Sequence, residues 1–244
     1  MAQSTGLVVL VTGANKGIGF ETARQIGLEG HTVLIGSRDA GRGDEAAGRL
    51  GSEGIDARPI ALDIRDATSR DSAAEQIRST FGRLDVLVNN AGTGVVGDGP
   101  PGAADLAQVR DLFEVNFFST LEIIQSMLPL LRKAPAGRIV NVSSGLGSLS
   151  RHSDPDWEFD AVRLTGYNCS KAALNMATIL LAKELAGTGI AVNSVAPGFT
   201  ATDLNGGGPG AQSPREGARA SVAAALRADG TTGGFLTHDG IEPW

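Results

Sequence analysis

The chain has 244 residues, of which 41% are hydrophobic and 20% charged, and its formal net charge is −6. These values are typical of a globular protein with a sizeable core, and an acidic balance without a Lys/Arg cluster argues against nucleic-acid binding. The single cysteine excludes an internal disulfide and suits the cytoplasm. No apolar run approaches the roughly 20 residues of a membrane helix. The three histidines show no metal-ligand spacing.

Short β-rich runs alternate with longer stretches of helical periodicity. Strands are predicted at 7–12, 32–37, 57–63, 84–90, 137–144, 190–197 and 234–240, and helices at 18–29, 39–53, 67–81, 105–133, 167–186 and 214–228. Several strand segments are continuously apolar, which is typical of parallel strands buried on both faces. The alternation predicts an α/β fold: a Rossmann-type, doubly wound, mostly parallel seven-stranded sheet with helices on both faces. No linker-like stretch divides the chain, so residues 1–244 are predicted to form a single domain.

The first predicted strand runs directly into TGANKGIG (12–19), a turn with three glycines before a helix. Glycine lets a backbone approach a pyrophosphate closely, and a helix N-terminus offers N–H groups and a positive dipole end. The spacing departs from the commoner G-x-G-x-x-G pattern, and a simple tight turn would also use glycine. The position after the first strand of an α/β pattern favours a dinucleotide site. Its predicted contacts are Gly13, Asn15, Lys16, Gly17, Ile18 and Gly19.

The residue after the second strand indicates which dinucleotide binds. A carboxylate there would accept hydrogen bonds from the ribose of NAD, whereas a cation would suit the 2′-phosphate of NADP. Arg38 is the first charged residue after that strand, and Lys16 could reach the same phosphate. NADP(H) is therefore the favoured cofactor. The alternative is NAD, with Asp39 bound to the ribose and both cations in solvent.

Two further strand ends carry candidate cofactor ligands. Asp63 ends the third strand and could accept a hydrogen bond from the adenine amino group, although a lone aspartate there is as often a helix cap. Asn90, Ala91 and Gly92 follow the fourth strand, at the carboxyl edge where such sheets bind ligands.

The one tyrosine of the chain, Tyr167, stands four positions before Lys171 in a predicted helix, so the two side chains share a face. A phenol ordinarily has a pKa near 10. A neighbouring ammonium favours the phenolate, and we expect it to lower the pKa of Tyr167. Such a phenol can donate a proton to a carbonyl oxygen while hydride adds to the carbon.

This chemistry also needs a donor that polarises the carbonyl group. Ser143 and Ser144 end the fifth strand at the carboxyl edge, and Asn116 is a polar residue among apolar ones in EVNFFST. Taken singly, the serines could be turn caps and Asn116 a hydrogen-bonded core amide.

Taken together, these motifs resemble the short-chain dehydrogenase/reductase family in their order and in the elements that carry them. They are TGANKGIG, NNAG (89–92), Asn116, VSS (142–144) and YNCSK (167–171), and the resemblance covers about residues 7–240. It implies that Tyr167 is the proton donor and that Lys171 tunes it and binds the nicotinamide ribose. It also implies that Ser144 holds the carbonyl oxygen and that Asn116 places a water in a relay to Lys171.

Other segments extend the resemblance. VNSVAPGFTATD (192–203) is similar to the family's segment after the sixth strand and implies Pro197, Gly198, Thr200 and Thr202 as nicotinamide contacts. NKGIGFE and SRD (37–39) resemble the carbonyl-reductase branch, which uses NADPH. The family's dimers commonly form through the helices at 105–133 and 167–186, so a monomer or a homo-oligomer through these helices is expected.

The interval between Ser144 and Tyr167 is longer than in compact family members, and the insertion is assigned to 148–166. Both of its ends lie at the predicted chemistry, so we expect a lid or a wall of the substrate pocket. Trp157 and Phe199 are predicted to line this pocket together with Ser144 and Tyr167. The alternative is that Trp157 only holds the insertion to the protein body or covers a dimer surface.

The residues and the resemblance together predict an NADPH-dependent carbonyl reductase that transfers hydride to a ketone or aldehyde. One alternative is an NAD-dependent alcohol dehydrogenase of the same fold. The other is a non-catalytic protein that senses the redox state of the dinucleotide, which would not require the Ser-Tyr-Lys-Asn set.

Overall fold

The computed structural model of the protein describes residues 6–94, 97–204 and 206–244. The described part contains the strands β1 (Val8–Thr12), β2 (Thr32–Ser37), β3 (Ala57–Ala61), β4 (Val86–Asn89), β5 (Arg138–Val142), β6 (Ala191–Val195) and β7 (Phe235–Leu236). They form one sheet in the order β3-β2-β1-β4-β5-β6-β7, with every neighbouring pair parallel. The predicted doubly wound seven-stranded sheet is confirmed, and its named strands are all parallel rather than mostly so.

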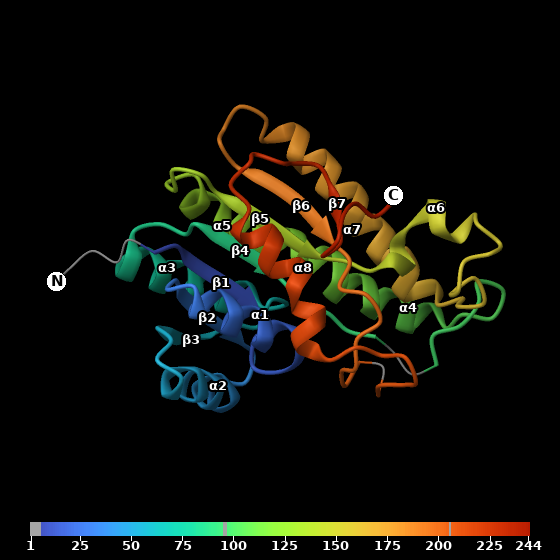
Figure 1. Ribbon diagram of the computed structural model, residues 1–244, viewed down its shortest axis with the longest axis horizontal. Coiled ribbons are helices and arrows are strands. Elements are labelled where there is room, and N and C mark those ends of the chain that lie inside the picture. The colour runs from blue at the N-terminus through green and yellow to red at the C-terminus, as the bar shows by residue number, and fades with distance from the viewer. Residues whose placement is uncertain (1–5, 95–96, 205) are drawn as a thin grey trace.

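Helices follow the strands along the chain (Figure 1). They are α1 (Gly17–Leu28), α2 (Ala40–Ser52), α3 (Ala67–Phe81), α4 (Leu106–Phe113), α5 (Ser119–Leu131), α6 (Leu149–His152), α7 (Thr165–Glu184) and α8 (Pro214–Leu226). A π-helical turn, η1 (Glu114–Phe118), joins α4 to α5, and a 3₁₀ turn, η2 (Gly145–Gly147), follows β5.

Two apolar cores lie on the two faces of the sheet. The first packs α1, α2 and α8 against residues such as Val9 and Val11, and the second packs α3, α5 and α7 against Val8 and Leu10. Alternate residues of β1 thus enter opposite cores, and all five are buried. Burial on both faces explains why the strands are continuously apolar in sequence.

Two predicted elements differ in kind or extent from the structure, and one helix was not predicted. The helix expected at 105–133 is interrupted by the π-helical turn at 114–118. The strand expected at 234–240 is wrong beyond Leu236, because Thr237 turns back and donates its N–H to the Gly240 carbonyl (2.9 Å). The short helix α6 lies inside the predicted insertion, where no helix was expected.

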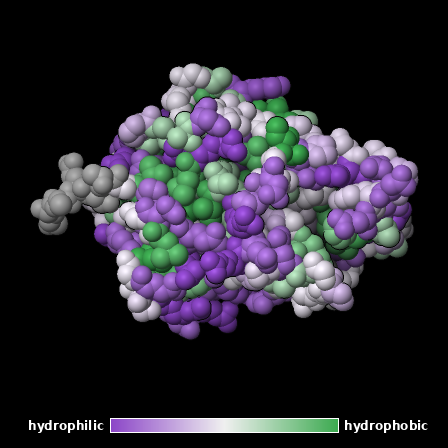
Figure 2. Space-filling view, viewed as in Figure 1, coloured by the Kyte–Doolittle hydropathy of each residue, from purple (hydrophilic) through white to green (hydrophobic). Residues whose placement is uncertain are grey.

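The surface seen in Figure 2 is mostly hydrophilic, and its apolar residues gather in separate patches. Across the described ranges, no helix has both the length and the apolar character needed to traverse a bilayer. The large apolar side chains are concentrated instead between the sheet and its helices.

The strand order reverses direction between β1 and β4. The chain moves outward from β1 through β2 to β3, and then crosses back to β4 on the other side of β1. In open α/β sheets such a reversal opens a crevice at the carboxyl ends of the two strands, where ligands bind. The fold therefore places the candidate site beside the segments that follow Thr12 and Asn89.

Candidate active site

The turn between β1 and α1 permits a close backbone approach. Gly13 has a φ of 64°, which favours glycine, and a Cβ there would lie 3.1 Å from the Ala91 Cα. A Cβ on Gly19 would lie 2.6 Å from the Gly13 carbonyl oxygen and would also collide with the Asn90 amide. Helix α1 follows Lys16, and no described side chain caps it, which suits a pyrophosphate bound at its first N–H groups. The residues of this turn therefore fit a dinucleotide.

The segment after β4 lies against this turn. The Asn90 side chain donates a hydrogen bond to the Thr12 carbonyl (2.9 Å), and the Thr12 hydroxyl accepts from the N–H groups of Asn90 (3.0 Å) and Ala91 (2.9 Å). The structure thus brings together the two predicted cofactor-binding segments at the crevice.

Tyr167 and Lys171 lie on one face of α7, as predicted. The Lys171 ammonium nitrogen lies 5.7 Å from the centroid of the Tyr167 ring and donates a hydrogen bond to the Val142 carbonyl (2.9 Å). The Tyr167 phenol forms a hydrogen bond with the Ser144 hydroxyl. Three of the four predicted catalytic side chains therefore meet where β5 ends and α7 begins.

The expectation of a lowered phenol pKa is wrong for the ligand-free protein. Burial raises the pKa of Tyr167, and the hydrogen bond with Ser144 opposes this shift only in part. Burial also lowers the pKa of the Lys171 ammonium to about 8. Removal from water disfavours the charged form of both groups and is the largest cause of both shifts.

The two serines at the end of β5 have different surroundings. Ser143 is buried, and its hydroxyl donates to the Lys171 carbonyl (3.4 Å). Ser144 is half-buried, and its hydroxyl also accepts from the Leu146 N–H (3.2 Å), so it caps the turn η2 while facing Tyr167.

Asn116 lies in the π-helical turn and is almost fully buried. Its side chain accepts from the Thr93 N–H (2.9 Å) and donates to the Thr93 carbonyl (2.9 Å) and to the Ser170 hydroxyl (3.2 Å). The amide therefore joins α7 to the segment after β4. π-Helical turns are rare and frequently occur at functional sites.

The segment after β6 also reaches the glycine turn. A Cβ on Gly17 would lie 3.8 Å from the Thr202 Cγ2 atom. The Gln212 amide donates hydrogen bonds to the carbonyl of Pro197 and to the hydroxyl of Thr200 (3.1 Å), which fixes the start of this segment. The structure thus places predicted nicotinamide contacts from 197–202 beside the crevice.

The predicted insertion lies close to Ser144. A Cβ on Gly145, the next residue, would lie 3.8 Å from the Trp157 ring. Trp157 packs edge-to-face against Phe159 (5.6 Å between centroids), and Phe159 lies 6.1 Å from Phe199. This aromatic row joins the insertion to the segment after β6 and begins beside Gly145.

The comparisons with known proteins agree with this geometry. The family described as short chain dehydrogenase matches residues 7–209. The protein belongs to the short-chain dehydrogenase family. It is 39% identical over 231 residues to the short-chain dehydrogenase anuI of Penicillium roqueforti, and the alignment covers 92% of this chain and 90% of the relative. It is 32% identical over 283 residues to NADPH carbonyl reductase 1 of Mus musculus, which covers 97% and 98%.

A solved structure has the same architecture. The NADPH-bound carbonyl reductase from chicken fatty liver superposes with a TM-score of 0.85 at 25% identity and covers 98% of this chain and 99% of its own. The resemblance to the carbonyl-reductase branch is thus confirmed, and the protein is a short-chain dehydrogenase of an oxidoreductase family that uses nicotinamide dinucleotides.

The residues after β2 distinguish the two cofactor hypotheses for this short-chain dehydrogenase. Arg38 is exposed at the end of β2. The Asp39 carboxylate accepts from the Arg42 N–H (3.0 Å) and caps α2, so one of its oxygens is already occupied. The Lys16 ammonium forms an ion pair with the Asp203 carboxylate (2.5 Å).

A cavity of about 250 Å³ lies beside the glycine turn, and one residue of its wall, Arg42, was not predicted from the sequence. The cavity is lined by Asn15, Lys16, Arg42, Glu45, Ala46, Arg49 and Asp203. Arg42 stands in the first turn of α2, so a search for cations over the whole βα connection after β2 would have found it.

Asp63 has the environment of a turn residue. Its Oδ1 atom accepts from the Arg65 N–H (3.0 Å), and its own N–H donates to the Ser69 hydroxyl (2.9 Å). Asp63 is not a helix cap, because the N-cap of α3 is Asp66. Its role as a ligand of the adenine amino group stays a prediction.

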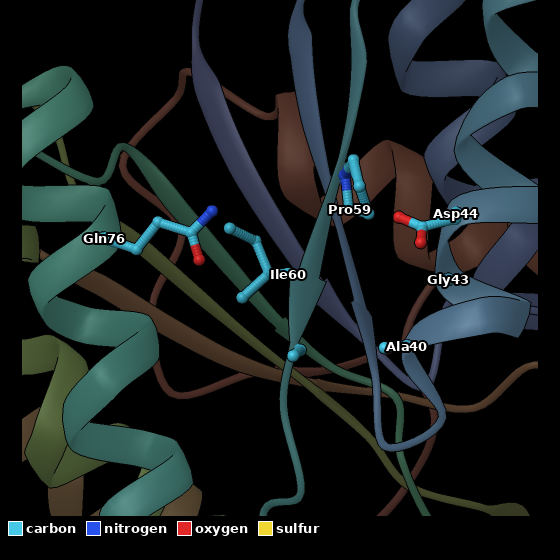
Figure 3. Close-up of a pocket in the computed structure, with 7 residues that line it drawn as sticks. Ala40, Gly43, Asp44, Pro59, Ile60 and Gln76 are labelled. Carbon is cyan, nitrogen blue, oxygen red and sulfur yellow. The ribbon is translucent and has the colours of Figure 1, made fainter.

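A second cavity, of about 230 Å³, lies at the edge strand β3, away from the predicted site residues (Figure 3). Asp44 reaches toward Pro59 from α2, and Gln76 reaches toward Ile60 from α3. None of the predicted catalytic or cofactor-binding residues lines it.

The raised pKa of Tyr167 has a direct test. The ligand-free protein should form the phenolate only at a pH above that of an ordinary tyrosine, about 10. Because Lys171 loses its proton near pH 8, its ammonium is gone before the phenol titrates. Tyr167 is the one tyrosine, so ultraviolet phenolate absorbance reports it alone. Tyr167→Phe serves as the blank, and a midpoint below that of the unfolded chain would contradict the assignment.

Proposed function

We propose that the protein is an NADPH-dependent carbonyl reductase that transfers hydride to a ketone or aldehyde and yields an alcohol. The observation that carries this proposal is the convergence of Ser144, Tyr167 and Lys171 beside a glycine turn that fits a dinucleotide. Family membership supports oxidoreductase chemistry, and several relatives are named carbonyl reductases.

The residues of the site have complementary tasks in this reaction. Tyr167 is protonated at neutral pH, since even an ordinary phenol titrates near 10, so it has a proton to donate to the substrate oxygen. The Ser144 hydroxyl donates a hydrogen bond to the same oxygen and polarises the carbonyl group. When bound, the cofactor supplies the hydride.

Lys171 and Asn116 support the proton donor. With a pKa of about 8, Lys171 is mostly charged at neutral pH, and its ammonium stabilises the phenolate that remains after proton transfer. We assign the same ammonium to bind the nicotinamide ribose. Asn116 binds α7 through the Ser170 hydroxyl, and we assign it to place the water of the proton relay.

The preference for NADP rests on the cations at the end of β2. Arg38 is exposed directly after β2, and Arg42 lines the cavity beside the glycine turn, where a 2′-phosphate would need neutralisation. Asp39, the ribose ligand of the NAD alternative, caps α2 through one oxygen and forms an ion pair with Arg42 through the other (3.6 Å). The mouse and chicken relatives are named for NADPH, which supports the same choice.

Cofactor oxidation with a panel of aldehydes, aryl ketones, quinones and ketosteroids tests the function. We expect substrate-dependent oxidation of NADPH and a clearly lower kcat/KM with NADH. A preference for NADH would favour the alcohol dehydrogenase alternative. Tight cofactor binding without turnover on the whole panel would favour a sensor.

Trp157 is proposed to line the substrate pocket. Trp157→Ala should lower kcat/KM by about ten- to a hundredfold for bulky carbonyls and much less for small ones, because an aromatic contact is worth about 1–3 kcal/mol. The Kd for NADPH should stay within about twofold, because the ring touches the insertion and Gly145 rather than the glycine turn. A uniform loss over all substrates together with a lower Tm would show that Trp157 is structural.

A further inference from the structure

Helix α7, which carries Tyr167 and Lys171, begins without a cap of its own. Its N-cap residue is Leu164, which is extended (φ −106°, ψ 92°), and neither a side-chain cap nor an acidic residue is found in the first turn. The first N–H groups of a helix lack partners within the helix, and Ser, Thr, Asp or Asn at the N-cap usually supplies them. Helices α2, α3 and α4 follow this rule with their own aspartates.

Asp98, on the segment after β4, takes the place of the missing cap. Its Oδ1 atom accepts from the Gly166 N–H (3.0 Å), and its Oδ2 atom accepts from the Tyr167 N–H (2.8 Å). These are the second and third positions of the helix, which an ordinary N-cap side chain would serve. The Gly99 carbonyl accepts from the N–H (3.0 Å) and the hydroxyl (2.6 Å) of Thr165. Two adjacent residues thus bind every N–H group from Thr165 to Tyr167.

The packing around Gly166 depends on this approach. A Cβ on Gly166 would lie 3.4 Å from the Asp98 Oδ2 atom, 3.2 Å from the Val109 Cα and in collision with Leu112. Glycine at this position lets the carboxylate and α4 reach the backbone of α7 together. The first turn of the helix is therefore held from two sides.

The segment that carries Asp98 begins at the cofactor crevice. Asn90 and Ala91 bind Thr12, and Thr93 binds Asn116. We propose that Asp98 is a positioning residue for the reduction, because it fixes the first turn of α7 and thereby aligns the Tyr167 phenol with Ser144 and the crevice. This role rests on the proposed function.

Asp98→Ala should lower kcat by about ten- to a hundredfold, because small displacements of a catalytic group are costly, while the Kd for NADPH changes less than about threefold. Amide hydrogen exchange at Gly166 and Tyr167 should become at least about tenfold faster, because both N–H groups lose their acceptor. Asp66→Ala is the matched control: Asp66 caps α3, which carries none of the predicted site residues. It should leave kcat and the exchange at Tyr167 unchanged.

A second-site variant tests whether Asp98 acts as a cap. Leu164→Asp in the Asp98→Ala background places a carboxylate at the N-cap itself and should restore most of the lost kcat. Wild-type kcat in Asp98→Ala, an equal loss in Asp66→Ala, or no recovery with Leu164→Asp would each overturn the proposal. If Asp98→Ala did not fold, Asp98→Asn would replace it. The amide keeps one acceptor oxygen, so an intermediate kcat supports the proposal and an unchanged one overturns it.

Carbonyl reduction by the wild-type protein tests the proposed function separately from this inference. If it reduced no carbonyl compound, the proposed function would fail. Exchange at Tyr167 in Asp98→Ala would still decide the capping role: faster exchange supports it, and unchanged exchange overturns it.

Discussion

Tyr167→Phe should lower kcat for carbonyl reduction by at least about a hundredfold, while the Kd for NADPH changes less than about threefold. The substitution removes the proton donor and keeps the aromatic ring beside the Lys171 ammonium. A positioned general acid contributes on the order of 10² to 10⁴ in rate. Because the proton is transferred only in the transition state, kcat and kcat/KM should fall together. Steady-state kinetics with the best carbonyl of the panel measures both.

Ser153→Ala is the control for the loss of a hydroxyl near the site. Ser153 is exposed in the insertion, and its hydroxyl donates to the Leu149 carbonyl (2.9 Å), so its removal should leave kcat within about twofold. Near-normal turnover in Tyr167→Phe would contradict the role of proton donor and would require another group to supply the proton.

The sheet and its main helices could be predicted from the sequence because the spacing of apolar residues along each element matches the faces that the fold buries. The ranges predicted for β2 (32–37) and α3 (67–81) are those of the structure. Elements that depend on distant contacts could not be predicted. The π-helical turn around Asn116 reads as continuous helix locally, and α6 is held by the hydrogen bond from the Ser150 N–H to the Trp244 carbonyl (2.8 Å).

The candidate site shows the same division. Strand ends of a parallel sheet share one edge, so the positions of Asn90 and Ser144 could be inferred from sequence. The pKa of Tyr167 could not, because burial is a property of the folded chain and is the largest cause of the shift. The pairing of Lys16 with Asp203 and the capping of α7 by Asp98 join residues far apart in sequence, and no local pattern indicates them.

Arg38→Asp should reverse the cofactor preference. The change removes a cation that can form charge-assisted hydrogen bonds to the 2′-phosphate, and it adds a carboxylate that repels that phosphate. A carboxylate at the end of β2 also suits the free ribose hydroxyls of NADH. If the lost bond and the added repulsion each contribute about 1.4 kcal/mol, each changes the ratio of the two Kd values about tenfold, and the ratio should shift by at least about a hundredfold. Fluorescence titration with NADPH and with NADH measures both constants.

Lys133→Asp is the matched control, because it makes the same change in charge. Lys133 is exposed between α5 and β5, near the amino ends of the strands, whereas the crevice lies at their carboxyl ends. It should leave the ratio unchanged, since exposed charges beyond about 10 Å are largely screened at moderate ionic strength. If Arg38→Asp still preferred NADPH, the phosphate would be bound elsewhere, and the cations of the cavity wall, Lys16, Arg42 and Arg49, would be substituted next. Loss of affinity for both cofactors alike would mean that Arg38 supports the α2 connection rather than the phosphate. Discrimination between the two cofactors is therefore the quantity that decides the role of Arg38.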